Sequence, residues 1–226
     1  MSTNPVILSR LKMDDNNQLI DEIDGVQWQN SNIPLSTEVY YPYSRYKFSL
    51  NFSNCADNDR NAYIKLLTDL NFSNQDYAIN MWVKINRTSG NWRSIMGPYE
   101  GNYITIWQID THVPGPALSW GQSEFNQGPY RINDGQWHNL VMARAGTNIR
   151  LFVDGKQNTI GNIGTSTVKS QYLLIGNGWD NYPFNGWLSD FTISRVTINR
   201  EFDLKELNRW FLKYPSVVYN NLKVEN

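Results

Sequence analysis

The sequence predicts an all-β sandwich. Apolar and polar residues alternate over residues 77–84, and this period of two is typical of a half-buried strand. Clusters of glycine, proline and asparagine separate such stretches along the chain, as turns do. Long helical patterns do not alternate with these strands, so antiparallel sheets are expected rather than βαβ units.

The strands follow one another from the N-terminus. Residues 6–12 form the first predicted strand, and residues 19–28 an extended or turn-rich return. Pro42 limits sheet pairing before the next strand. The later strands are expected at 46–52, 77–84, 103–109, 117–120, 137–144, 149–153, 172–176 and 185–198.

Residues 134–155 predict a hairpin. Two strands flank the turn at 145–148, and the period of two places Ile149, Leu151 and Val153 on one face, towards a core. Asp154 and Gly155 are residue types that tolerate positive φ, so a second reversal follows.

One segment predicts a short helix. Asp203 is an N-cap with Glu206 three residues later, and apolar residues recur near helical spacing up to Tyr214. Pro215 ends this helix. Residues 215–226 contain too few apolar residues for a further element and are expected to form a tail.

The amino-acid sequences of several predicted strands resemble those of the laminin G-like domains of the concanavalin A-like lectin/glucanase superfamily. The segments that carry the resemblance are 46–52, 77–84, the Trp-His strand with the Leu-Phe-Val-Asp-Gly strand in 137–155, 174–176 and 184–191. The resemblance implies one jelly-roll domain over residues 1–214, made of two antiparallel sheets. It is specific for the fold, and it does not specify a ligand.

Composition limits the partners. The formal net charge is −1, which gives no basic field for nucleic acid, and no stretch is apolar enough for a membrane helix. Cys55 is the single cysteine, so no intrachain disulfide forms. The N-terminus lacks the apolar region of a signal peptide, and we therefore expect synthesis in the cytosol without export by that route.

Catalytic patterns are incomplete. Glu22 and Asp24 imitate the start of the carboxylate motif of laminarinase-type enzymes, but Val26 occupies the position of the next acid, so a solvated acidic turn is favoured. His138 is interpreted as a structural strand residue. Cys55 has no neighbouring basic cluster that would stabilise its thiolate form. No enzyme activity is therefore expected.

Calcium is the best metal candidate. Asp57 and Asp59 supply oxygens at alternate positions, without the glycine and glutamate of an EF-hand. The resemblance implies a further carboxylate at the position of Ser189, and Asp190 follows it, which the period of two places on the opposite face.

Glycan binding is the function that the resemblance implies. Sugar sites combine aromatic rings with amides and carboxylates, and two loops carry that mixture. The candidate residues are Trp179, Asp180, Asn181, Tyr182, Tyr99, Glu100, Asn102 and Tyr103. Trp82, Trp137 and Trp187 are instead expected in the core, where Trp137→Ala would cost ~3–5 kcal/mol.

The sequence thus favours a non-enzymatic recognition or adhesion module for a glycan or glycoprotein surface. A component of a virus or phage particle fits the expected cytosolic synthesis. Such a component can contact other virion proteins and can form a homo-oligomer. One alternative is a protein-binding module that uses residues 40–46 or the tail. A glycan-active enzyme with an unrecognised site is the other.

Overall fold

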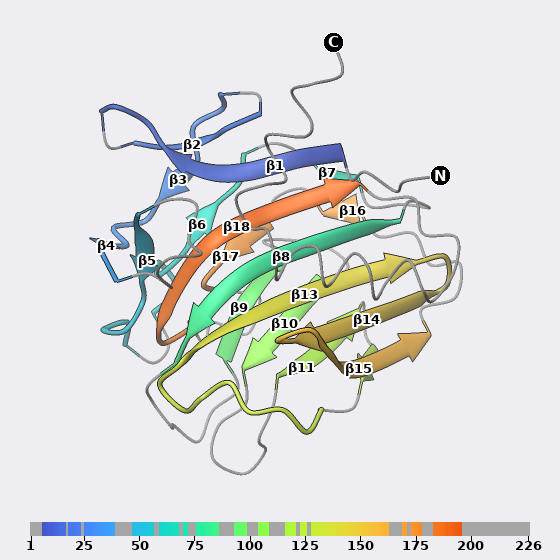
Figure 1. The fold of residues 1–226 in the computed structure, drawn as a ribbon. Coiled ribbons are helices and arrows are strands. Elements are labelled where there is room, and N and C mark those ends of the chain that lie inside the picture. Colours follow the sequence, from blue (N-terminus) through green and yellow to red (C-terminus); the bar gives the residue numbers. More distant parts are fainter. Residues whose placement is uncertain are drawn as a thin grey trace.

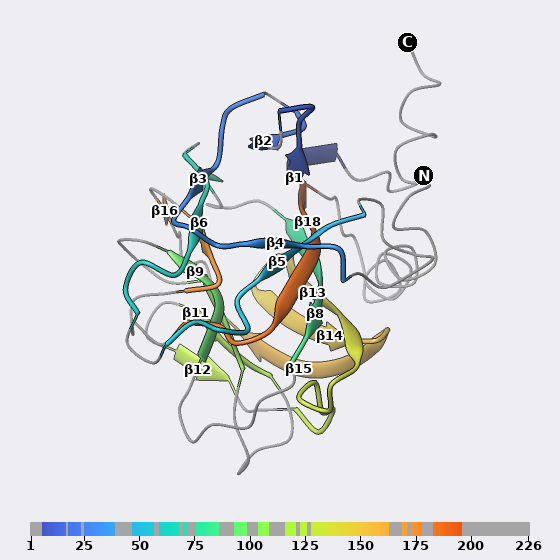
Figure 2. The same ribbon diagram turned by 90° about the vertical axis from the view of Figure 1, so that its left-hand side faces the viewer.

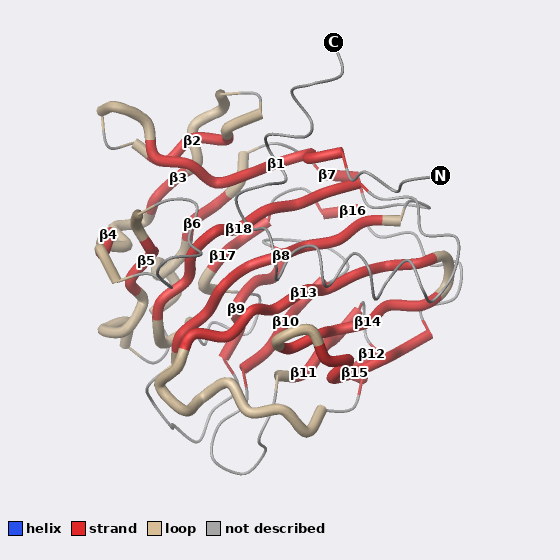
Figure 3. Tube along the Cα trace, in the orientation of Figure 1, coloured by secondary structure: helices blue, strands red, loops and turns tan. Residues whose placement is uncertain are grey.

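A computed structural model describes residues 6–16, 18–23, 25–38, 47–56, 59–67, 70–71, 76–85, 93–98, 104–108, 116–120, 123–125, 128–162, 169–170, 173–177 and 183–195. All regular structure in these ranges is strand, as Figure 3 shows in red. The predicted helix at 203–214, the tail and the segment 40–46 lie outside them. No helix long and apolar enough to cross a membrane occurs in the described ranges.

The larger sheet has nine strands, and all of its pairs are antiparallel. Its main path runs β15-β14-β13-β8-β18-β1-β2, with β5 beside β18 and β4 beside β5 (Figure 1). The strands are β1 (Val6–Met13), β2 (Leu19–Asp21), β4 (Leu35–Ser36), β5 (Ser49–Asn51), β8 (Tyr77–Lys84), β13 (Trp137–Ala145), β14 (Asn148–Val153), β15 (Lys156–Asn162) and β18 (Trp187–Arg195).

The second sheet has seven strands in the order β12-β11-β10-β9-β17-β6-β3, and these pairs are antiparallel as well. A small third sheet pairs β16 with β7. The bounds are β3 (Gln29–Asn30), β6 (Ile64–Lys65), β7 (Leu70–Asn71), β9 (Arg93–Pro98), β10 (Ile104–Gln108), β11 (Ala117–Trp120), β12 (Ser123–Phe125), β16 (Lys169–Ser170) and β17 (Leu173–Ile175).

The two large sheets face each other and enclose the core, as the side view in Figure 2 shows. Strand β8 shows how the sequence produces this arrangement. Tyr77, Ile79, Met81 and Val83 are buried in the common apolar cluster, while the residues between them lie on the other face of the sheet. The predicted two-sheet sandwich is therefore confirmed.

The hairpin also forms as predicted. Strands β13 and β14 pair from Leu140 opposite Val153 to Ala145 opposite Asn148. The turn into β15 has positive φ at Asp154 (47°) and Gly155 (79°), which is the left-handed backbone those residue types tolerate. This reversal places the Asp154 carboxylate beside the start of β13.

Strand β18 departs from simple alternation. A bulge interrupts its pairing with β8 between Ser189 and Thr192, and Asp190 has a φ of 52°. The Ser189 hydroxyl donates to the Asp190 carboxylate at 3.1 Å. The expectation that these two side chains lie on opposite faces is therefore wrong, because the bulge breaks the period of two.

Candidate functional site

The eight glycan candidates predicted from the sequence fall in two segments. Residues 178–182 and 99–103, which contain all eight of them, lie outside the described part of the chain. The described residues instead bring a different set of aromatic and polar side chains together, at one end of the larger sheet.

This set, which we call the tryptophan row, consists of Trp137, Lys84, Trp187 and Asn51. Lys84 on β8 lies opposite Trp137 on one side and opposite Trp187 on the other, and Trp187 lies opposite Asn51. Residues directly opposite each other in a sheet project from the same face. Two strand spacings, about 10 Å, therefore separate the two tryptophan backbones.

The row projects away from the core. Val83, Leu188 and Leu50 point into the buried apolar cluster, so their neighbours Lys84, Trp187 and Asn51 point outwards. Both Trp137 and Trp187 are half-buried and lie outside that cluster. The prediction that these two rings are core residues is therefore wrong.

Close packing beneath the row fixes its position in the sheet. Trp82, one step inwards along β8 on the same face, is only 4% exposed. Gly186 precedes Trp187, and a Cβ at this glycine would lie 2.2 Å from the Lys84 carbonyl oxygen. Only glycine permits this close approach, which holds Trp187 beside Lys84.

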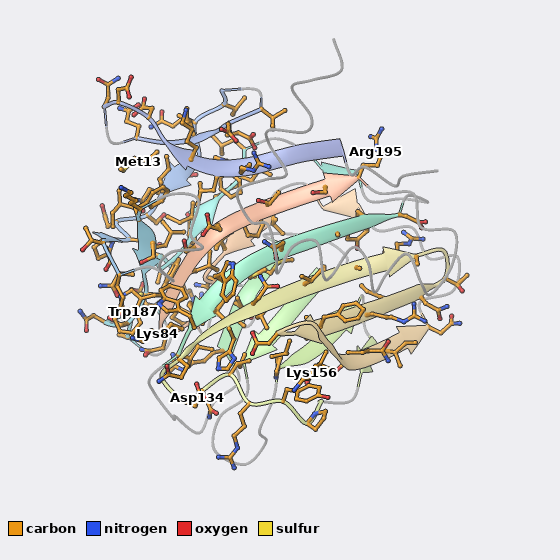
Figure 4. All side chains as sticks on the ribbon, viewed as in Figure 1. Met13, Lys84, Asp134, Lys156, Trp187 and Arg195 are labelled. Carbon is orange, nitrogen blue, oxygen red and sulfur yellow. The ribbon has the colours of Figure 1, made fainter. Side chains whose placement is uncertain are left out.

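Charged groups lie beside the rings. The Lys84 ammonium forms an ion pair with Glu38 and lies 5.6 Å from the centre of the Trp187 ring. Figure 4 shows Lys84 and Trp187 together at one edge of the molecule. Lys84 is 21% exposed and Glu38 37% exposed, so solvent reaches both groups. The row thus offers two aromatic surfaces with hydrogen-bond donors and acceptors between and beside them.

A histidine clamp adjoins the row. His138 follows Trp137, and its ring nitrogens bind two carboxylates: Nδ1 lies 2.7 Å from Asp154 and Nε2 lies 2.9 Å from Asp134. Burial acts to lower the pKa of His138, but the hydrogen bonds and charges of Asp154 and Asp134 outweigh it and raise that pKa above 6.5. Both ring nitrogens are thereby engaged, which agrees with the structural role expected for His138 at the hairpin end.

The clamp makes stability depend on pH. A histidine pKa that is raised in the folded state stabilises the protein fully below the unfolded pKa, and the gain is lost as pH rises through the folded pKa. The free energy of unfolding of the native protein should therefore fall more between about pH 6 and pH 9 than that of His138→Gln. Urea denaturation at the two pH values measures this, and equal losses in both proteins would contradict the clamp.

The calcium candidates do not assemble into a visible site. The Asp59 carboxylate accepts a hydrogen bond from the backbone N–H of Asn61 at 3.0 Å, and Asp190 accepts one from Ser189. Asp57 lies outside the described residues. Among those described, no three His, Cys, Asp or Glu side chains converge as metal ligands do. Calcium binding stays a prediction.

Burial and the nearby Asp59 raise the pKa of Cys55 to about 11 in spite of Arg93, so this thiol is protonated at neutral pH and is a poor nucleophile. Glu22 is not a solvated acid, because it binds Arg10 at 2.7 Å and is only 10% exposed. Glu22 therefore forms half of a nearly buried ion pair.

A family comparison matches most of the described sandwich. Residues 58–201 match the model of the family Laminin_G_3, described as the concanavalin A-like lectin/glucanases superfamily. The matched range contains Lys84, Trp137 and Trp187 of the tryptophan row. No curated protein matches the chain.

Solved structures share the fold at low identity. Domain 4 of AbnA, a GH43 extracellular arabinanase from Geobacillus stearothermophilus in complex with arabinotriose, has a TM-score of 0.64 at 16% identity, covering 91% of this chain and 99% of that domain. The botulinum neurotoxin serotype D ligand-binding domain in complex with N-acetylneuraminic acid has a TM-score of 0.58 at 15% identity, covering 90% of this chain. The binding domain of Paraclostridial Mosquitocidal Protein 1 has a TM-score of 0.64 at 15% identity, covering 92%.

The extent of these matches differs. The chain spans nearly the whole arabinanase domain, but only 50% of the neurotoxin domain and 52% of the mosquitocidal domain. At these identities, the likeness shows the fold.

Proposed function

Because the chain belongs to the concanavalin A-like lectin/glucanases superfamily, we propose that it is a non-catalytic glycan-recognition module that binds sugar on the tryptophan row. The observation that carries the proposal is the pair of half-buried tryptophans on either side of Lys84. Two similar structures are described as complexes with arabinotriose and with N-acetylneuraminic acid, and these relatives support sugar as the ligand class.

The row suits the two kinds of surface that a sugar presents. The apolar C–H faces of a sugar ring stack on an indole, and the hydroxyl groups around the ring need donors and acceptors. The Lys84 ammonium can donate hydrogen bonds to sugar hydroxyl groups, and the Glu38 carboxylate can accept them. Lys84 belongs to the row, and Glu38 is its ion-pair partner. With two tryptophans about 10 Å apart, an extended oligosaccharide can place one ring on each.

The charges around the row support recognition without hydrolysis. Glycoside cleavage needs a carboxylic acid that can donate a proton and a second carboxylate opposite it. Glu38 is bound to Lys84, and Asp134 and Asp154 are bound to His138. Burial tends to raise the pKa of Asp134, but its hydrogen bonds from His138 and Gln136 lower it overall, which is opposite to what an acid catalyst requires.

Trp187→Ala is expected to weaken glycan binding at least about tenfold, since it removes one stacking surface. The measurement is a glycan array with the native protein, followed by calorimetric titration of the best ligand. Trp187→Phe keeps an aromatic face and should recover part of the affinity. Ile160→Ala, on β15 of the same sheet, replaces an exposed apolar residue and is the matched control that should bind like the native protein.

Folding does not confound this test. Since the Trp137 and Trp187 rings are only half-buried, each alanine variant should lose about 1–2 kcal/mol of stability, less than the ~3–5 kcal/mol of a core tryptophan. Urea denaturation checks the cost. Native affinity in a folded Trp187→Ala variant would contradict binding on the row.

We also propose that the module acts on the surface of a virus or phage particle and is made in the cytosol. One cysteine and a core held by packing alone support folding in a reducing compartment. Purified particles from the source of the chain should carry the protein, as antibody labelling with electron microscopy can measure. If the protein were found only free in solution and not on the particles, this assignment would be wrong.

A further inference from the structure

A polar groove lies away from the tryptophan row, where β2 and β3 end the two sheets. It has a volume of about 460 Å³, within the range of small-molecule sites. Figure 1 places β2 and β3 at upper left, whereas Lys84 and Trp187 of the row lie at lower left in the same orientation in Figure 4. The described lining residues are Gln18, Leu19, Gln27, Trp28, Gln29, Asn30, Leu35 and Leu67.

Four of the eight lining residues carry side-chain amides. Gln18, Gln27 and Gln29 are exposed, and no described hydrogen bond uses their side chains. Asn30 differs, because its amide binds the backbone of Ile33 in both directions, at 2.8 and 3.0 Å. Three glutamine amides therefore face solvent with both donors and acceptors available, beside the 43% exposed Leu67.

A buried indole forms part of the groove wall. Trp28 is 1% exposed, and its indole Nε1 has no hydrogen-bond partner in the described structure. Its ring packs edge-on against Phe191, with the ring centres 5.8 Å apart, so the indole is held in place by the core. Because the Nε1 atom is itself buried, a ligand does not reach it, and Trp28 serves as a fixed part of the wall whose indole signal reports occupancy of the groove.

Charge distinguishes this groove from the row. None of the eight described lining residues is ionisable, although Lys65 lies opposite Gln29 in the strand register. A ligand carboxylate would lose its hydration without gaining a cation from these eight residues. Hydroxyl groups, in contrast, can donate to and accept from planar amides at once.

We propose that the groove is a second, independent binding site for an uncharged polyhydroxy ligand, namely a neutral oligosaccharide. This inference rests on the proposed glycan function for its ligand class, but its residues are separate from the row. A chain with two sugar sites can bind two sugars of the same glycan surface at once. This raises the overall affinity for that surface, although neither site makes additional contacts.

The indole N–H signals of the native protein test the proposal, by ¹H–¹⁵N NMR with neutral trisaccharides (arabinotriose, cellotriose, maltotriose and mannotriose) and with sialyllactose. A neutral trisaccharide should shift the Trp28 indole signal and the side-chain amide signals of Gln18, Gln27 and Gln29. Sialyllactose should shift these signals less. If all four neutral sugars leave the Trp28 and glutamine signals unchanged, or if sialyllactose alone shifts them, the proposal is wrong.

Variants separate the two sites. Gln27→Ala with Gln29→Ala should abolish the Trp28 response and leave the Trp187 response intact, while Trp187→Ala should do the reverse. Gln157→Ala, an exposed glutamine on β15, is the matched control and should change neither response. A Trp28 response without a Trp187 response would support the groove and contradict the row, and the opposite pattern would contradict the groove alone.

Discussion

Phe191→Ala is expected to lower the free energy of unfolding by about 3–5 kcal/mol. Phe191 is fully buried on β18, the strand between β8 and β1 in the larger sheet, and its ring contacts Trp28 edge-on. Removing the ring leaves a cavity where the two sheets meet, because a close-packed core relaxes only partly.

Urea denaturation measures this loss, with Ile160→Ala as the control. Ile160 is 49% exposed on β15, so its truncation should change stability by no more than about 0.5 kcal/mol. A loss of about 1 kcal/mol or less in Phe191→Ala would mean that Phe191 does not lie in the core between the sheets.

Gly176→Ala is expected to cost about 2–5 kcal/mol for two separate reasons. The backbone φ of Gly176 is +83°, where an L-residue is strained. A Cβ there would also lie 2.1 Å from the Phe52 ring, which is fully buried against Phe184. Because this ring is fully buried and packs against Phe184, moving it aside costs packing energy, which adds to the backbone strain.

Gly25→Ala separates the two costs. Gly25 has a similar φ of +73°, but nothing lies within 4 Å of the position of its Cβ. Its substitution should show the backbone cost alone, about 1–2 kcal/mol. Thermal unfolding of both variants gives the comparison, and equal losses would refute close packing of Phe52 over Gly176.

Regular alternation made parts of the fold predictable from the sequence. Strand β8 has the predicted bounds at 77–84, and β11 those at 117–120. The Asp154–Gly155 reversal was predictable because few residues accept positive φ. In each case the local pattern and the tertiary environment favour the same structure.

Strand β9 was not predicted, although it lies in the middle of the seven-stranded sheet. Its sequence contains Arg93, Ser94, Gly97 and Pro98, which give no period of two and suggest a loop. The structure stabilises it through partners distant in sequence. The buried Arg93 donates to the Pro183 carbonyl oxygen at 2.9 Å, and β10 and β17 flank the strand.

The tryptophan row was missed for a related reason. Its two tryptophans and its lysine come from strands that are far apart in the sequence, and only the sheet register brings them together. Tryptophan at a strand end resembles a core residue when its environment is unknown. A usable signal was present, since Trp187 alternates with the core residue Leu188 and must face away from it.

The groove was missed because amides carry little signal in a sequence. Gln18, Gln27 and Gln29 stand in a segment expected to be turn-rich, where exposed polar residues need no explanation. Their common position depends on Trp28, whose backbone N–H donates to the Leu19 carbonyl oxygen at 2.9 Å and brings the strands together.

A crystal structure of the native protein with the strongest ligand from the glycan array tests the central claim most directly. Glycan recognition on the tryptophan row predicts sugar rings stacked on both Trp137 and Trp187, with hydroxyl groups bonded to Lys84 or Glu38. A ligand bound elsewhere on the sandwich, with both tryptophan faces free of sugar, would contradict it.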